Sequence, residues 1–124
     1  MDVPSPGFYY HYRHNLDGAI YNYAYELLNI SRHSENDCRL IDKELVIYRP
    51  LYPTASAYIN VQGSLWHARP LSIWCDCVTL DSGVVVPRFT RITDKSIVEQ
   101  LIWQCLEMYQ EVPLFILRGV TWTN

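Results

Sequence analysis

Short apolar and aromatic runs alternate with polar, turn-forming segments over the first 92 positions of the chain. Runs of this length, rich in β-branched and aromatic residues and bounded by Gly, Pro, Asn, Asp and Ser, are typical of antiparallel strands. The pattern predicts strands over residues 7–14, 21–33, 44–52, 64–74 and 84–92. Pro50, Pro70 and Pro87 interrupt three of these runs. Because proline cannot donate to a ladder, each marks a strand end, an edge or a bulge.

The periodicity changes after residue 92, where apolar residues recur at steps of three and four up to Gln110. Thr93 or Asp94 is a suitable N-cap for this segment. The apolar stripe is wide enough to dock on a sheet. Pro113 ends the predicted helix, and the apolar residues 114–123 predict one more strand, broken at Gly119.

These elements predict an α+β fold that is mainly β. The expected architecture is a small SH3-like antiparallel barrel or bent sheet, with one C-terminal helix and a terminal strand. A chain of 124 residues can bury one core and is short for two. We therefore expect a single domain over residues 1–124, with a β-barrel core at 7–92 and a helix-plus-strand extension at 93–124.

Composition excludes several classes of protein. A net charge of −3 and a pI near 5.7 argue against binding long nucleic acid or anionic membranes by bulk electrostatics. No run of 18 apolar residues is present, and "MDVPSPG" lacks the features of a signal peptide. The four cysteines contain no CxxC pair and predict neither a zinc site nor a disulfide framework. We expect a cytoplasmic protein without a metal or cofactor.

Five segments together suggest a family. They are "GFYYHYRHN", "YELLNISRHSE", "ELVIYRPLY", "LWHARPLSIW" and "VPRF". In order and character they resemble the small bacterial and phage family catalogued as domain of unknown function 1653. The resemblance covers about residues 7–92 and leaves the segment from Thr93 onward as an addition. It implies a small β domain, and since the family's activity is unassigned, it implies no mechanism.

The chain departs from the family pattern in three places. It has the extra residues "LDGAIYN" after the first strand and a longer loop, "PTASAYINVQ", before Trp66. It also has Ile73 and Trp74 where the family tends to have Met and Phe. The two longer loops could reshape any groove that they border.

Arginine recurs beside aromatic rings in these segments, and this pattern indicates a binding surface. Strand alternation places Tyr9, His11 and Arg13 on one face and Phe8 with Tyr10 on the other. One face is expected to supply core rings and the other a mixed aromatic and cationic surface. Guanidinium forks suit carboxylates and phosphates, and aromatic faces stack on planar groups. The candidate ligand-binding residues are Arg13, His33, Arg49, Tyr52, Trp66 and Arg69.

Such a surface predicts a non-enzymatic domain that binds an anionic, nucleotide-like small molecule as a sensor or a sequestering protein. Tyr52 and Trp66 border the long loop 53–63, which could close over a ligand. A module for a peptide or a short single strand of nucleic acid is an open alternative.

Two further alternatives concern the arginines and catalysis. The arginines could instead pair with acidic residues of neighbouring strands, namely Glu26, Glu35, Asp42 and Glu44. An enzyme acting on phosphate esters through a His and Arg site is the other alternative, although no nucleophile, base and orienter motif is present. The predicted terminal strand needs an edge to pair with, which favours a homodimer.

Overall fold

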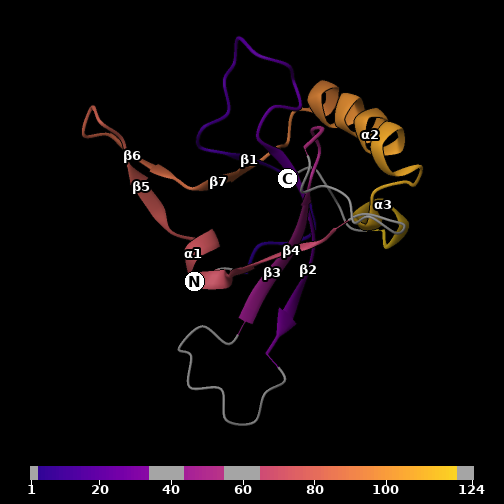
Figure 1. Cartoon of the computed structure of the whole chain (residues 1–124), viewed down its shortest axis with the longest axis horizontal. Helices are drawn as coiled ribbons and strands as arrows, with labels where there is room; N and C mark the ends of the chain where they lie inside the picture. Colours follow the sequence, from indigo (N-terminus) through magenta and orange to yellow (C-terminus); the bar gives the residue numbers. More distant parts are fainter. Residues whose placement is uncertain (1–2, 34–43, 55–64, 120–124) are drawn as a thin grey trace.

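The computed structural model describes residues 3–33, 44–54 and 65–119 and contains mainly antiparallel strands with a few helices (Figure 1). The strands are β1 (Gly7–His11), β2 (Ala24–Arg32), β3 (Glu44–Pro50), β4 (His67–Pro70), β5 (Cys77–Thr79), β6 (Val85–Pro87) and β7 (Phe89–Arg91). The helices are α1 (Leu71–Trp74), α2 (Lys95–Tyr109) and α3 (Leu114–Leu117). No helix in these ranges combines the length and apolarity needed to span a bilayer.

Five strands pair in the order β4-β3-β2-β1-β7, and β5 and β6 form a separate hairpin. Every pairing is antiparallel. The register of β2 on β3 shifts between Leu27 and Asn29, which marks a β-bulge. Among the described residues the order is open, with β4 and β7 at the ends, and this agrees with the bent-sheet form of the prediction.

Helix α2 covers one face of the sheet, as Figure 1 shows. The Asp94 side chain caps the helix by accepting a hydrogen bond from the backbone N–H of Ile97 at 3.1 Å. The buried cluster beneath the helix combines sheet and helix residues, which are Phe8, Ala24, Leu51, Ile92, Val98, Leu101, Cys105 and Phe115. The predicted helix and its docking on the sheet are confirmed.

A second buried cluster lies on the opposite face of the sheet. Its members are mostly aromatic and comprise Tyr9, Leu27, Val46, Tyr48, Trp74 and Phe89. The alternation predicted for the first strand is confirmed, since Phe8 and Tyr9 belong to different clusters. Both faces of β1 therefore carry buried rings, and the expected cationic surface begins only toward its C-terminal end.

Two segments differ from the predicted strands. Residues 114–117 form helix α3 instead of a terminal strand, and the segment expected at 64–74 is a strand only up to Pro70. Pro113 and Pro70 occupy the N-cap positions of α3 and α1, where extended proline precedes one helical turn. Short apolar runs do not distinguish a strand from a buried helical turn. Residues 120–123 of the predicted terminal strand lie outside the described residues, and the homodimer stays a prediction.

Candidate functional site

The face of the sheet opposite α2 carries closely packed aromatic rings. Trp74 of α1 stacks on Phe89 of β7, with centroids 3.7 Å apart and planes inclined by 4°. Tyr25 of β2 and Tyr48 of β3 contact Phe89 at centroid distances of 5.9 and 6.4 Å. We call these four residues the aromatic floor. Trp74, Phe89 and Tyr48 are buried, so these interlocked rings form a rigid apolar layer of the core.

Strand β4 places a cation against the aromatic floor. The guanidinium carbon of Arg69 lies 5.4 Å from the ring centroid of Phe89 and 5.9 Å from that of Tyr48. His67, two residues earlier, contacts the Tyr48 ring at 5.5 Å, so both side chains lie on one face as predicted. No carboxylate of the described ranges forms an ion pair with Arg69. Its charge is therefore not neutralised by this part of the chain.

Three guanidinium groups act on the imidazole of His11. His11 ends β1 and contacts the Phe89 ring at 5.2 Å. Burial first, and then the charges of Arg69, Arg13 and Arg88, lower the pKa of His11 to about 4. The contacts agree with this: the Arg13 backbone N–H donates to His11 Nδ1 at 3.2 Å, Arg88 precedes the cross-strand partner of His11, and Arg69 lies against the Phe89 ring that His11 contacts. We call Arg13, Arg69 and Arg88 the arginine group.

Arg88 contributes a buried donor that has no acceptor among residues 3–33, 44–54 and 65–119. Its backbone is held on both sides, since its N–H donates to the Asp76 carbonyl and its carbonyl accepts from Tyr12 N–H, each at 2.9 Å. Its side-chain Nε is buried and makes no hydrogen bond. Because nearly all buried polar atoms in proteins are paired, this Nε–H is an unusual feature that a bound acceptor would satisfy.

Arg13 lies at the edge of the site, toward the β5–β6 hairpin. Its Nε donates to the Tyr12 hydroxyl at 3.2 Å, and the side chain is exposed. Beside it is a hollow of about 230 Å³, which is lined by Tyr12, Arg13, Val78, Thr79, Leu80 and Asp81. The hollow extends the surface accessible to a ligand from the arginine group to the hairpin.

Two phenols complete the polar rim. The hydroxyls of Tyr25 and Tyr52 lie 2.6 Å apart, and either can be the donor. Burial, followed by the hydrogen bond to Tyr52, raises the pKa of Tyr25. Both side chains are half-buried. The Tyr25 phenol therefore keeps its proton at neutral pH and can donate a hydrogen bond to an acceptor on this face.

Arg49 does not join this site, because it lies on the other face of the sheet. Its side chain is fully buried, with its Nη2 2.8 Å and its Nε 2.9 Å from Oε1 of Glu26. Glu26 and Arg49 are cross-strand partners on β2 and β3. The alternative that arginines pair with acidic residues of neighbouring strands holds for Arg49, and also for exposed Arg32 with Glu44 at 3.8 Å.

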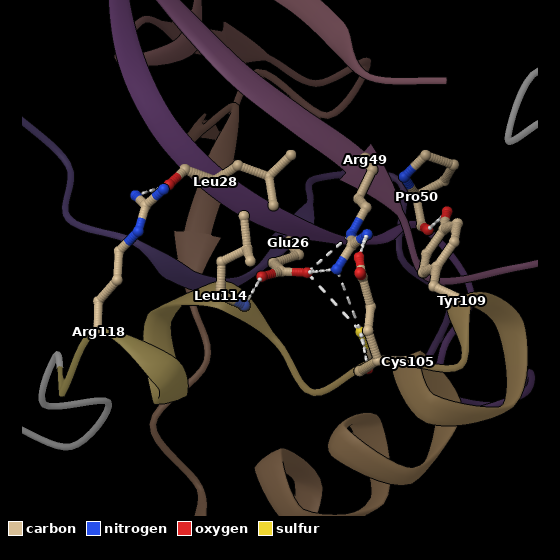
Figure 2. A network of polar contacts seen from close by, with 9 residues as sticks. Glu26, Leu28, Arg49, Pro50, Cys105, Tyr109, Leu114 and Arg118 are labelled. Carbon is tan, nitrogen blue, oxygen red and sulfur yellow. Dashed lines mark hydrogen bonds and ion pairs between the residues drawn. The ribbon is translucent and has the colours of Figure 1, made fainter. Parts of the chain in front are cut away.

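The buried pair belongs to a polar network that joins the sheet to the helices, which Figure 2 shows from close by. The backbone N–H of Leu114, at the start of α3, donates to Oε2 of Glu26 at 2.8 Å. Glu111 also pairs with Arg49, and the Arg49 guanidinium carbon lies 4.3 Å from the ring centroid of Tyr109. Burial raises the pKa of Glu26, which Arg49 and the Leu114 N–H counter by favouring the carboxylate. This network is structural.

Two other predicted residues flank strands of the sheet. His33 follows β2 directly and is exposed. Trp66 precedes β4 and is 51% exposed. Residues 55–63 of the loop 53–63, which was predicted to close over a ligand, lie outside the described residues, as do Glu35 and Asp42. The structure thus brings together Arg13, Tyr52 and Arg69 from the predicted set.

Sequence reasoning left out three residues of this face. His11 shares a face with Arg13 by alternation, but it was not selected because its two neighbours are also aromatic. Arg88 was within the "VPRF" segment, and its proximity to His11 depends on the pairing of β1 with β7. Tyr25 lies in the "YELLNISRHSE" segment, where the Tyr–Glu pair gives no indication of which side chain faces outward.

Two titratable groups of the described residues are held in their neutral forms near pH 7. Burial, and then the Glu26 carboxylate, raise the pKa of the Cys105 thiol to about 12, so this cysteine is not a thiolate at neutral pH. His11 is unprotonated near pH 7 and cannot serve there as a general acid. Within the described ranges no three His, Cys, Asp or Glu side chains gather as a metal site. The arrangement offers cations, phenol donors and a planar floor.

The lowered pKa of His11 predicts how its ring titrates. We expect the His11 ring to remain neutral down to about pH 4, because protonation adds a charge beside three guanidinium groups. An unfolded chain would protonate this histidine near its ordinary pKa of 6.5, so the unfolded state binds more protons between pH 6.5 and 4. Stability should therefore fall as pH falls through that window.

The measurement is a ring-proton NMR titration, together with urea unfolding at several pH values. The variant His11→Gln should remove part of the pH dependence of unfolding between pH 6.5 and 4. A His11 midpoint near 6.5 in the folded protein would contradict the proximity of the arginine group.

Comparison with known proteins gives a family match and one structural neighbour. A family model described as "Protein of unknown function (DUF1653)" matches residues 7–91. A crystal structure of a DUF1653 protein from Bordetella bronchiseptica is 27% identical and superposes with a TM-score of 0.47. The alignment covers 71% of this chain and 86% of that one. No curated protein matches.

Proposed function

The chain belongs to the DUF1653 family of proteins of unknown function, and from that premise we propose that it is a non-enzymatic domain that binds an anionic, nucleotide-like small molecule. It would act as a sensor or a sequestering protein. The residues that bind are Arg13, Arg69 and Arg88, with Tyr25, Tyr52 and His11 on the rim. All of them lie within residues 7–91, which the family model matches.

One observation carries the proposal: the guanidinium groups of Arg13, Arg69 and Arg88 all act on His11, and none of them has an ion-pair partner in the described ranges. Gathering like charges costs free energy that a bound anion recovers. Guanidinium groups pair with phosphate or carboxylate oxygens through two parallel hydrogen bonds. A phosphate-bearing ligand would therefore relieve this repulsion.

The aromatic floor supports the nucleotide-like part of the proposal. Arg69 already lies over the rings of Phe89 and Tyr48, which shows that a planar cation fits against this surface. A planar heterocycle can stack on the outer face of the half-buried Arg69 guanidinium, which the buried floor holds in place. The Tyr25 and Tyr52 hydroxyls can donate to ring nitrogens, carbonyls or sugar oxygens at the rim.

The cysteines are consistent with our proposal of a cytoplasmic location. Among the described residues, Cys75, Cys77 and Cys105 form no disulfide. Proteins of oxidising compartments usually join such cysteines in disulfides, whereas cytoplasmic proteins leave them reduced.

Native mass spectrometry of gently purified protein tests the proposal. We expect a stoichiometric extra mass on the wild type, either retained from the cells or acquired from added ADP. Arg69→Ala and Arg88→Ala should lose it. Arg32→Ala is the matched control, since that side chain is 76% exposed and away from the arginine group. A wild type that stays bare even with ADP, or an adduct that both arginine variants keep, would contradict the proposal.

A further inference from the structure

A groove separate from the arginine group runs along the outer surface of α2. It has a volume of about 540 Å³ and is lined by Tyr21, Pro53, Gln100, Trp103, Gln104, Glu107 and Met108. We call it the α2 groove. Since α2 covers the face of the sheet opposite the aromatic floor, a partner in this groove would not compete with a ligand at the arginine group.

Trp103 is the most conspicuous residue of the α2 groove. Its side chain is 72% exposed. In the described part of the chain it makes no ring contact or hydrogen bond. Exposing an indole to water forfeits the free energy of burying a large aromatic surface. Tryptophan is also among the residues most often found at the centre of protein interfaces.

The charge of the groove favours a cation. Glu107 is exposed and forms no ion pair within the described ranges, and no basic residue lines the groove. Lys95 is the only basic residue of α2, and it lies two helical turns before Trp103. An indole face and a carboxylate one turn apart both attract a cation. The Gln104 amide, which makes no hydrogen bond with the described residues, adds a further acceptor.

We propose that the α2 groove binds an arginine or lysine side chain of a basic polypeptide partner. The cation lies over the Trp103 indole and pairs with the Glu107 carboxylate, and the flanking peptide follows the helix between Tyr21 and Gln100. A polypeptide fits better than a small organic cation because Trp103 protrudes from the surface instead of lining an enclosed cage. A basic peptide also complements the net charge of −3.

NMR titration of the isotope-labelled full chain tests this site. The probe is the peptide acetyl-Gly-Arg-Gly-Arg-Gly-amide, and the matched ligand replaces each arginine with neutral citrulline. We expect the arginine peptide to shift the Trp103 indole N–H and neighbouring amides of α2. Glu107→Gln should weaken binding by about three- to tenfold and Trp103→Ala by a similar factor, as expected for one ion pair or one cation–π contact.

Glu99→Gln is the control, because Glu99 is exposed on the same helix but does not line the groove. It should leave the affinity nearly unchanged. If Glu99→Gln weakened peptide binding as much as Glu107→Gln does, the peptide would be attracted to the overall charge of the helix and not to the groove. That result would overturn the proposal. Equal shifts with the citrulline peptide, or no shift at Trp103 with the arginine peptide, would also overturn it. Circular dichroism of each variant would show that the fold is retained.

Discussion

Replacing Arg49 with alanine is expected to lower the free energy of unfolding by about 3–5 kcal/mol, the loss typical of breaking a buried ion pair. The substitution leaves the Glu26 carboxylate without its cation in a position where its side chain is fully buried. It also removes the contact with Glu111 and the contact with the Tyr109 ring. Urea denaturation followed by circular dichroism measures the loss.

Two companion variants test the cause of that loss. Arg32→Ala breaks an exposed ion pair and should cost about 0–1 kcal/mol. The double variant Glu26→Gln with Arg49→Met removes both buried charges, and it should be more stable than the sum of the two single losses predicts. If Arg49→Ala were as stable as Arg32→Ala, the Glu26–Arg49 pair would not be the buried junction that the structure describes.

Truncation after Ile92 is expected to abolish cooperative folding, although the whole family-matched segment, residues 7–91, remains. Phe8, Ala24 and Leu51 pack beneath the helices, and truncation removes Val98, Leu101, Cys105 and Phe115 from the same cluster. Burying side chains such as these contributes about 1.5–3 kcal/mol each, whereas small domains are stable by only about 5–15 kcal/mol. The buried Glu26–Arg49 pair would also lose its cover.

Size-exclusion chromatography and NMR of the truncated chain provide the measurement. We expect an unfolded or self-associated product with poor signal dispersion. A chain that ends at Gly119 is the control, since it keeps every residue of both buried clusters, and it should fold. A monomeric, well-dispersed spectrum from residues 1–92 would show that the helices are an addition to an independent domain.

The side-chain alternation of the first strand was predictable because it depends only on local geometry. Period-two spacing put Phe8 and Tyr9 on different faces, and the two buried clusters confirm it. The sequence could not show that both faces would be covered. That outcome depends on α2 docking on one side and Trp74 stacking on Phe89 on the other, which are contacts between distant segments.

The role of Arg49 shows the limit of reading a site from sequence. In the sequence, Arg49 follows an aromatic residue, Tyr48, and Arg69 also lies close to an aromatic residue. Adjacent residues of one strand, however, point to opposite faces of the sheet. Helix α2 docks on the face that carries Arg49 and Glu26, and these two side chains are therefore buried. Arg69 lies on the other face, against the aromatic floor. The strand register, and not the local residue pattern, carries that information.

The helix at 114–117 was missed for a different reason. Four apolar residues after a proline span only about one helical turn, so their pattern is equally compatible with a strand. Their conformation is set by contacts outside the segment. Phe115 packs edge-on against Phe8 at 5.0 Å, and the N–H of Leu114 donates to Glu26.

The binding proposal is tested most directly by following the arginine side-chain Nε–H resonances by NMR while ADP is added to the full chain, with adenosine as the uncharged comparison. We predict that ADP shifts the resonances of Arg69 and Arg88 and the ring signals of His11, and that buried Arg49 stays unchanged. Adenosine should produce smaller shifts, because it lacks the phosphates that the arginine group would hold. No response of Arg69 and Arg88 to ADP, or an equal response to adenosine, would contradict an anion site at this face.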